Sequence, residues 1–107
     1  MIDELNRLVN IVKKLRAPDG CDWDNIQTSK SLIPYLLEET YEVIEAIEKE
    51  DSQLLKEELG DLLLHIIFQT EIAEEKKNFQ LSDSIKHVCD KLVDRHPHIF
   101  NDNKDKT

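Results

Sequence analysis

The sequence is poor in the residues that interrupt helices. Its 107 residues include two glycines and three prolines, and aromatic residues make up 6% of the chain. A chain with so few turn-forming residues must be built from a few long elements. No stretch shows the sustained alternation of a half-buried strand, whereas four stretches repeat apolar residues at helical spacing. The sequence therefore predicts an all-α protein.

Basic residues and long apolar runs are also scarce. The chain has 14 Lys and Arg against 23 Asp and Glu, which gives a net charge of −9. A protein that binds nucleic-acid backbones or anionic membrane needs a basic face, so we expect neither partner. No apolar run approaches the ~20 residues of a membrane span, and we expect no signal peptide. Cys21 and Cys89 fit neither a disulfide framework nor a zinc site. A cytoplasmic protein is the expectation.

The apolar spacing places four helices at about residues 2–15, 31–49, 52–76 and 83–96. Ser31, then Asp51 or Ser52, and then Ser82 or Asp83 are the expected N-caps. Amphipathic helices joined by short connections favour a four-helix antiparallel bundle. Residues 1–100 are expected to form this single domain, and the polar tail at 101–107 is expected to be disordered. The predicted core includes Ile47, Leu59 and Ile66.

Carboxylates of the second and third predicted helices lie at matching angles beside the core face. At ~100° per residue, each helix has one carboxylate at about 300° and one at about 240° from the centre of its apolar face. The four residues are Glu39, Glu42, Glu58 and Asp61. An ionised carboxylate directed at a core is costly unless it is protonated, paired or bound to a cation. The lysines lie mostly at the helix ends, which favours an all-oxygen site for Mg²⁺ or Mn²⁺. A solvated acidic face is the alternative.

His65 lies on the same helical stripe as Glu58 and raises the question of a different metal. Ferritin-like di-iron bundles need Glu-x-x-His pairs from two helices. The histidine follows Glu58 by seven residues, and the second predicted helix contains no histidine. We therefore interpret His65 as a hydrogen-bonded packing residue.

Four stretches of the chain carry a further pattern. Residues 38–42 (EETYE) and 58–61 (ELGD) read as EExxE followed by ExxD. Residues 15–24 are similar to LRxPxGCPWD, residues 27–32 to QTHxSL and residues 95–100 to RHPHVF, with Asp22 and Ser29 departing from those patterns. Together these stretches resemble the MazG family of all-α nucleoside triphosphate pyrophosphohydrolases over nearly the whole chain.

The resemblance implies hydrolysis of a nucleoside triphosphate to the monophosphate and pyrophosphate, with Mg²⁺ as cofactor or Mn²⁺ in its place. It also implies that Glu39, Glu42, Glu58 and Asp61 hold the metal ion. Glu38 lies on the rim of the acidic face and is our candidate for orienting or deprotonating the attacking water. A solvated surface glutamate is the alternative interpretation of Glu38.

The resemblance further implies that Lys91 and Arg95, four apart on one helix face, hold phosphate oxygens. Pairing of these two residues with Asp90 or Asp94 is the alternative. Trp23 is the single tryptophan and is a candidate for stacking on the nucleobase, although it could equally cap the end of the bundle.

Three functions stay open at this point. The leading one is a pyrophosphohydrolase of broad base specificity that cleans nucleotide pools. The second is a narrower enzyme similar to a dUTPase or dCTPase, and the third is a catalytically silent MazG-like module for dimerisation or regulation. All five acidic positions of the pattern are present, which favours an enzyme. Since so short a chain has little material to close an acidic cleft, we expect a homodimer or a dimer of dimers.

Overall fold

The chain is all-α in the part that the structure describes, residues 2–100 of a computed structural model. The predicted polar tail at 101–107 lies outside these residues. Over residues 2–100 the helices are α1 (Ile2–Arg16), α2 (Asp22–Ile26), α3 (Ile33–Glu48), α4 (Ser52–Glu75), α5 (Leu81–Arg95) and α6 (Pro97–Phe100). The all-α prediction is confirmed, and the four long helices lie where apolar spacing placed them. The short helices α2 and α6 were not expected.

The helix starts follow the predicted caps in one case of three. Asp51 caps α4, since its carboxylate accepts a hydrogen bond from the Leu54 N–H at 3.1 Å. The prediction for Ser31 was wrong: its hydroxyl donates to the Gln27 amide oxygen at 2.7 Å, and α3 begins after Leu32. The cap of α5 is Gln80, whose N–H is bound by the Asp83 carboxylate at 2.8 Å, so this helix starts earlier than predicted.

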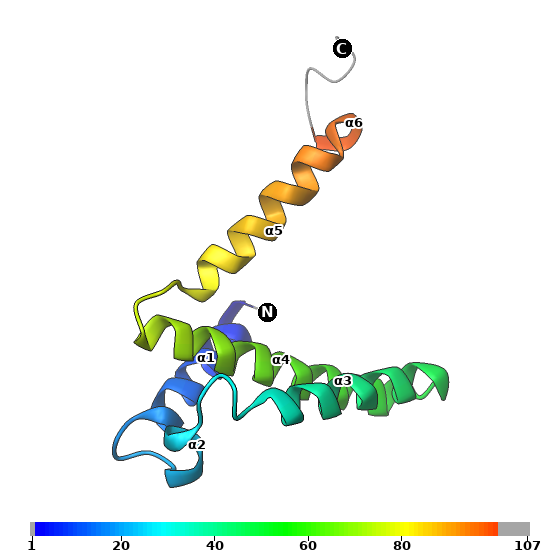
Figure 1. Ribbon diagram of the computed structural model, residues 1–107. Coiled ribbons are helices and arrows are strands. Elements are labelled where there is room, and N and C mark those ends of the chain that lie inside the picture. The colour runs from blue at the N-terminus through cyan, green and yellow to red at the C-terminus, as the bar shows by residue number, and fades with distance from the viewer. Residues whose placement is uncertain (1, 101–107) are drawn as a thin grey trace.

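Helices α3 and α4 form an antiparallel hairpin, and α1 crosses the C-terminal half of α4 (Figure 1). Both α3 and α4 end on a residue in the left-handed conformation, Glu50 with φ 54° and Lys77 with φ 61°. The backbone bonds from Asp51 N to Ala46 O and from Asn78 N to Ala73 O complete a Schellman ending at each site. Non-glycine residues at these positions explain how long helices end in a chain with so little glycine.

The hydrophobic core lies where α1 and the start of α3 meet the C-terminal half of α4. Its buried members are Val12, Leu32, Ile67, Phe68 and Ile72. The predicted core face of the α3/α4 hairpin was partly wrong, because three of its members are exposed: Ile47 by 56%, Leu59 by 48% and Ile66 by 43%. These side chains lie on surfaces that no other helix of the described chain covers.

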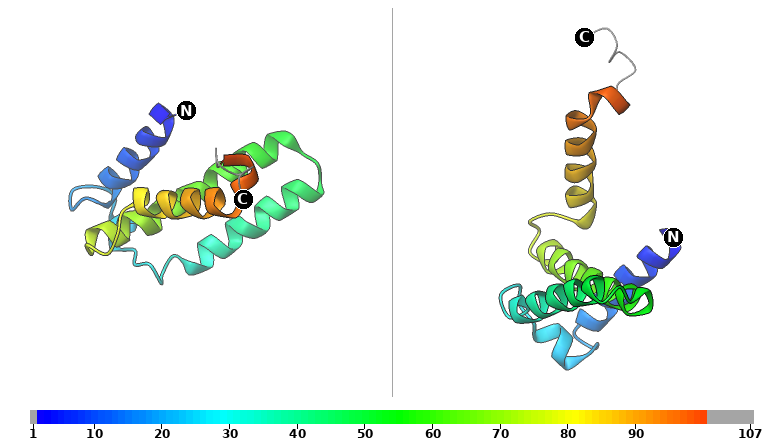
Figure 2. Two further views of the ribbon diagram at one scale, coloured as in Figure 1. Left: turned by 90° about the horizontal axis from the view of Figure 1, so that it is seen from above. Right: turned by 90° about the vertical axis from the view of Figure 1, so that its right-hand side faces the viewer.

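Helix α5 extends away from the rest of the molecule (Figures 1 and 2). Within residues 2–100 it contacts α4 and α6 but not α3. The radius of gyration is 17.3 Å, compared with about 13 Å for a compact domain of this length. An apolar groove of about 610 Å³ opens between α1, α4 and α5, with Leu5, Leu8, Leu63, Ile66, Ile85 and Val88 among its walls. One chain therefore leaves substantial apolar surface uncovered.

None of the helices within residues 2–100 combines the length and the apolar character that crossing a membrane requires.

Candidate active site

Three of the predicted carboxylates converge between α3 and α4. Glu39 of α3 and Glu58 and Asp61 of α4 each offer one oxygen, and these oxygens lie within 4.8 Å of one another. Glu58 and Asp61 share a helix face because they are three residues apart. The antiparallel pairing of the two helices brings Glu39 opposite them. We call these three residues the acidic cluster.

The acidic cluster is short of partners. One carboxylate oxygen of Glu39 and one of Glu58 are enclosed and have no hydrogen-bond partner among the described residues. The salt bridges formed within residues 2–100 all involve other acidic residues. Enclosed carboxylate oxygens that lack a cationic side chain are the donors that a divalent cation takes. The residues present therefore fit Mg²⁺ or Mn²⁺.

Glu42 borders the acidic cluster without being one of its three converging residues. A hydrogen bond with Glu42 is the largest cause that raises the pKa of Glu58 to about 7. Burial is the first cause of the raised pKa of Glu39, and Glu42 is the second. Since carboxyls that share one site cannot all ionise freely, the cluster favours a proton in the absence of a cation. Glu38, the predicted water-activating residue, is exposed and is not one of the three converging residues.

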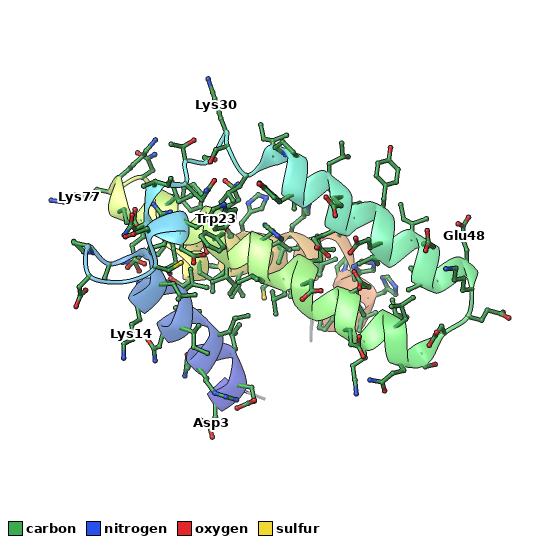
Figure 3. The ribbon with its side chains drawn as sticks, turned by 90° about the horizontal axis from the view of Figure 1, so that it is seen from below. Asp3, Lys14, Trp23, Lys30, Glu48 and Lys77 are labelled. Carbon is green, nitrogen blue, oxygen red and sulfur yellow. The ribbon has the colours of Figure 1, made fainter. Side chains whose placement is uncertain are left out.

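Aromatic rings lie directly beside the acidic cluster, on the side toward α2. The rings of Tyr35 and His65 are 6.3 Å apart between centroids with planes 4° from parallel, and His65 lies 6.3 Å from Phe68. Trp23 meets Tyr35 edge-on at 5.5 Å, and it lies at the end of the α3/α4 hairpin opposite Glu48 (Figure 3). Trp23 and Tyr35 are 44% and 42% exposed. Tyr35 was not singled out from the sequence.

His65 packs between aromatic rings, but the hydrogen bond expected of it is missing at one ring nitrogen. Its Nδ1 is enclosed and has no partner among the described residues. Burial lowers the pKa of His65, which keeps the ring neutral near pH 7. The neighbouring Asp61 acts on this pKa in the opposite direction. The prediction that His65 is a hydrogen-bonded packing residue was therefore wrong for Nδ1, although the ring does pack against its neighbours.

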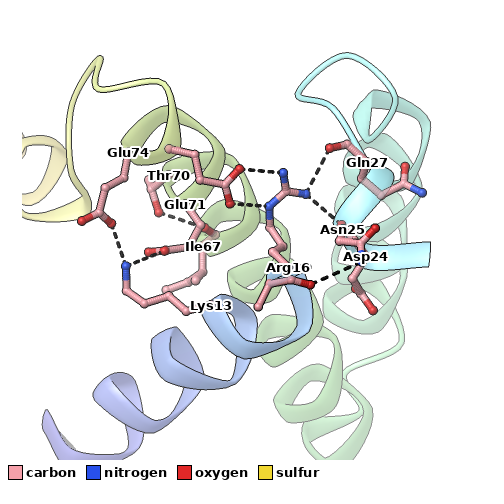
Figure 4. A network of polar contacts seen from close by, with 11 residues as sticks. Lys13, Arg16, Asp24, Asn25, Gln27, Ile67, Thr70, Glu71 and Glu74 are labelled. Carbon is pink, nitrogen blue, oxygen red and sulfur yellow. Dashed lines mark hydrogen bonds and ion pairs between the residues drawn. The ribbon is translucent and has the colours of Figure 1, made fainter. Parts of the chain in front are cut away.

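Arg16 holds the segment that carries Trp23 against α4 (Figure 4). Its side chain is 7% exposed and binds both carboxylate oxygens of Glu75, at 2.7 and 2.8 Å. It also donates to the carbonyls of Asp24 and Gln27, at 2.8 and 3.0 Å. The Arg16 guanidinium lowers the pKa of Glu75. Sequence reasoning missed this role, because the partners of Arg16 come from three separate segments.

Gly20 lies in the connection between α1 and α2, where the chain passes close to the end of α1. A Cβ atom at Gly20 would lie 2.3 Å from the Lys14 carbonyl oxygen and 2.5 Å from that of Leu15. The chain can fold back against the end of α1 at this point because glycine has no Cβ. This return positions α2 against α1, and with it Trp23 against the ring of Tyr35 on α3.

Lys13 makes a second link between α1 and α4 (Figure 4). Its ammonium group lies 2.6 Å from the carboxylate of Glu71 and 2.8 Å from that of Glu74. Glu71 is 4% exposed, so Lys13 neutralises a buried charge. The two carboxylates raise the pKa of Lys13. The ion pairs of Lys13 and Arg16 together fix α1 to the helix that carries Glu58 and Asp61.

Lys91 and Arg95 are not brought to the acidic cluster within one chain. Both are exposed on α5, which diverges from α4 and has no contact with α3 in the described chain (Figure 1). They border a shallow depression on α5 together with His87, Asp90 and Asp94. Lys86 is the residue that pairs with Asp90.

Comparisons with known proteins identify the family. The model of the MazG nucleotide pyrophosphohydrolase domain matches residues 27–100. The chain is 52% identical over 95 residues to the nucleoside triphosphate pyrophosphohydrolase/pyrophosphatase MazG of Thermotoga maritima, covering 89% of this chain and 37% of that protein. It is 45% identical over 102 residues to the nucleoside triphosphate pyrophosphohydrolase of Escherichia coli K12, covering 94% and 39%.

A third relative is the uncharacterized protein YabN of Bacillus subtilis, 45% identical over 101 residues that cover 94% of this chain and 21% of that protein. The chain therefore spans 21–39% of the length of these three curated relatives. The matched residues include the acidic cluster, Tyr35, His65, Lys91 and Arg95. Because the domain model covers more than half of the sequence, the chain belongs to the MazG nucleotide pyrophosphohydrolase domain family.

Proposed function

We propose that the chain is a Mg²⁺-dependent pyrophosphohydrolase that cleaves nucleoside triphosphates between the α- and β-phosphates. The observation that carries the proposal is the convergence of Glu39, Glu58 and Asp61 at a place where no cationic side chain of residues 2–100 pairs with them. A polyanionic triphosphate and a protein of net charge −9 need a cation between them. The printed names of the Thermotoga and Escherichia relatives support the same reaction.

The acidic cluster would hold the metal ion, with Glu42 as the fourth carboxylate. When bound, Mg²⁺ supplies positive charge next to the phosphate oxygens, and Mn²⁺ could take its place. Three or four carboxylates within one site suit a hard, oxygen-binding cation such as Mg²⁺ or Mn²⁺. The enclosed oxygens of Glu39 and Glu58 support these assignments.

We assign to Glu38 the role of orienting or deprotonating the attacking water. Glu38 immediately precedes Glu39 on α3, and its exposure leaves its carboxylate open to solvent. A carboxylate at the edge of the cluster can orient a water molecule or accept its proton while the buried carboxylates keep their own role. If Glu38 activates the water and the cluster binds the metal ion, Glu38→Gln is expected to lower kcat without weakening metal binding.

The phosphate-binding role of Lys91 and Arg95 requires a second copy of the chain. In one chain these residues lie on a helix that does not contact α3. The apolar residues of α5 support its burial against another surface, since Ile85, Val88 and Leu92 are 43%, 41% and 49% exposed. Two copies related by a two-fold axis would each offer α5 to the other. We therefore propose a homodimer, or a dimer of dimers, in which α5 completes the partner's site.

Trp23 is proposed to stack on the nucleobase, which its 44% exposure and its contact with Tyr35 support. Broad base specificity follows from stacking, because every base has an aromatic face. The role would be to clean nucleotide pools in the cytoplasm, and the substrate would be a free nucleoside triphosphate rather than a nucleic acid.

Pyrophosphate release from a panel of eight NTPs and dNTPs, with Mg²⁺ or with EDTA, tests the proposal. Release from most of the panel with Mg²⁺ alone is the expected result. Release from dUTP or dCTP only would favour the narrower enzyme. Absence of pyrophosphate from every nucleotide would overturn the proposal in favour of a silent module. Light scattering that gives a mass near 12.5 kDa at micromolar concentration would contradict the dimer.

A further inference from the structure

The surface differs on the two sides of the acidic cluster along α3 and α4, and the reaction itself does not explain the difference. On the side toward α2, the next turn of α3 presents Tyr35 and the next turn of α4 presents His65. Toward the hairpin turn, the neighbouring residues of α3 are Val43 and Ala46, which are buried. A ligand that extends from the cluster along exposed aromatic surface therefore has to extend toward α2.

The acidic cluster, His65 and Trp23 follow one another in the same order as the phosphates, the sugar and the base of a nucleotide. Four residues, or ~6 Å along α4, separate the level of Asp61 from that of His65. Trp23 lies beyond this level and meets the ring of Tyr35 edge-on. A sugar follows the α-phosphate of a nucleotide directly, and the base follows the sugar. With the phosphates at the acidic cluster, the sugar comes to the level of His65 and the base to the exposed rings of Trp23 and Tyr35.

Packing alone does not account for a histidine at position 65. The ring lies between Tyr35 and Phe68, where a phenylalanine would stack as well. The imidazole instead leaves an enclosed Nδ1 without a partner in the described part of the chain, which is a cost that a purely apolar ring avoids. No hydrogen bond to either ring nitrogen within residues 2–100 fixes the tautomer, and Nε2, unlike Nδ1, is not an enclosed atom, so a ligand hydroxyl can find either a donor or an acceptor at Nε2.

We propose that His65 is the residue that reads the sugar of the substrate by hydrogen bonding to a ribose hydroxyl, with Tyr35 and Trp23 forming the surface on which the base lies. This inference rests on the proposed function, because it needs the triphosphate at the acidic cluster. It assigns the preference between ribonucleotides and deoxyribonucleotides to one side chain of α4.

The test compares wild type with His65→Phe and His65→Asn. The base is the one whose triphosphate wild type hydrolyses best. For this base, kcat/KM is measured with the ribonucleoside triphosphate, the 2′-deoxynucleoside triphosphate and the 3′-deoxynucleoside triphosphate. Wild type is expected to discriminate against one of the two deoxy forms. His65→Phe is expected to lower kcat/KM for the favoured sugar by at least about tenfold and to bring that ratio near one. His65→Asn, which keeps a hydrogen-bonding group, is expected to retain part of the discrimination.

Two outcomes overturn the inference while leaving the proposed function intact. One is a set of sugar ratios that stays within twofold of wild type in His65→Phe. The other is a wild type that releases pyrophosphate but does not discriminate among the three sugars. A wild type that hydrolyses no nucleotide instead refutes the proposed function, and the inference falls with it. Thermal unfolding of the two variants separates a change in specificity from a loss of fold.

Binding gives a second readout that needs no turnover. Trp23 is the single tryptophan, so its fluorescence reports on ligands that reach the aromatic surface. Titration with a nucleoside monophosphate in the presence of Mg²⁺ is expected to quench this fluorescence to saturation, and ribose 5-phosphate is expected to leave it unchanged. Equal responses to the two compounds, or no response to either, would contradict the placement of the base.

Discussion

Binding of Mg²⁺ to the acidic cluster is expected to release a proton in an amount that depends on pH. The carboxyl of Glu42, through a hydrogen bond, is the largest cause that raises the pKa of Glu58 to about 7. A carboxylate must lose its proton before it binds a metal ion. The expected release per bound ion is therefore about 0.9 proton at pH 6, about 0.5 at pH 7 and about 0.1 at pH 8, from a single group with this pKa.

Titration calorimetry in pairs of buffers with different ionisation enthalpies measures this number. Glu58→Gln keeps the shape of the side chain but cannot ionise, so it is expected to bind Mg²⁺ more weakly and to release less proton than wild type, with the remainder coming from Glu39, whose pKa is also raised. Glu57→Gln is the matched control, because Glu57 is exposed and hydrogen-bonded to Gln53 at 2.9 Å. A release of zero at pH 7 in wild type, or a release that does not change with pH, would show that Mg²⁺ does not displace a proton from Glu58.

Three further predictions concern stability and catalysis. Without metal, the melting temperature is expected to fall as pH rises from 5 to 7.5 more steeply in wild type than in Glu58→Gln. The raised pKa of Glu58 gives a stabilisation that is present below its ordinary value of 4.5 and lost as pH rises through about 7; equal slopes would contradict this. Lys13→Met leaves the buried carboxylate of Glu71 unpaired and should lower the unfolding free energy by about 2 kcal/mol, less than for a fully buried pair because Lys13 is 45% exposed. Denaturant titration measures this loss, and adding Glu71→Met should recover most of it. In steady-state kinetics Arg95→Ala should chiefly raise KM, whereas Glu38→Gln should lower kcat with Mg²⁺ binding retained; loss of Mg²⁺ binding in Glu38→Gln would make Glu38 a ligand instead.

The helices could be predicted from the sequence because their apolar residues recur at helical spacing over long stretches. The ends of the helices were harder to predict, since they depend on local hydrogen bonds. The Ser31 hydroxyl binds the loop residue Gln27 rather than α3, and Gln80 caps α5 although glutamine is not a typical cap. The apolar faces were predicted without knowledge of which one the chain covers, so Leu59 and Ile66 were assigned to the core although they are exposed.

The convergence of Glu39, Glu58 and Asp61 could be predicted because it needs only helix geometry and antiparallel pairing. The role of Arg16 could not, because its partners lie on α2, on the loop that follows it and at the end of α4. Likewise, the spacing of Lys91 showed which helix face it shares but not the direction of α5. That direction is set by a short connection after α4 that carries no periodic signal.

We propose that the acidic cluster makes this chain a Mg²⁺-dependent pyrophosphohydrolase. The most direct test is pyrophosphate formation from a nucleoside triphosphate, measured against Mg²⁺ concentration for wild type and Asp61→Asn, with circular dichroism to confirm that both are folded. We predict that wild type forms pyrophosphate and the monophosphate in equal amounts with Mg²⁺ and none with EDTA, and that Asp61→Asn is folded and inactive. Equal activity in a folded Asp61→Asn, or release of orthophosphate in place of pyrophosphate, would contradict the account.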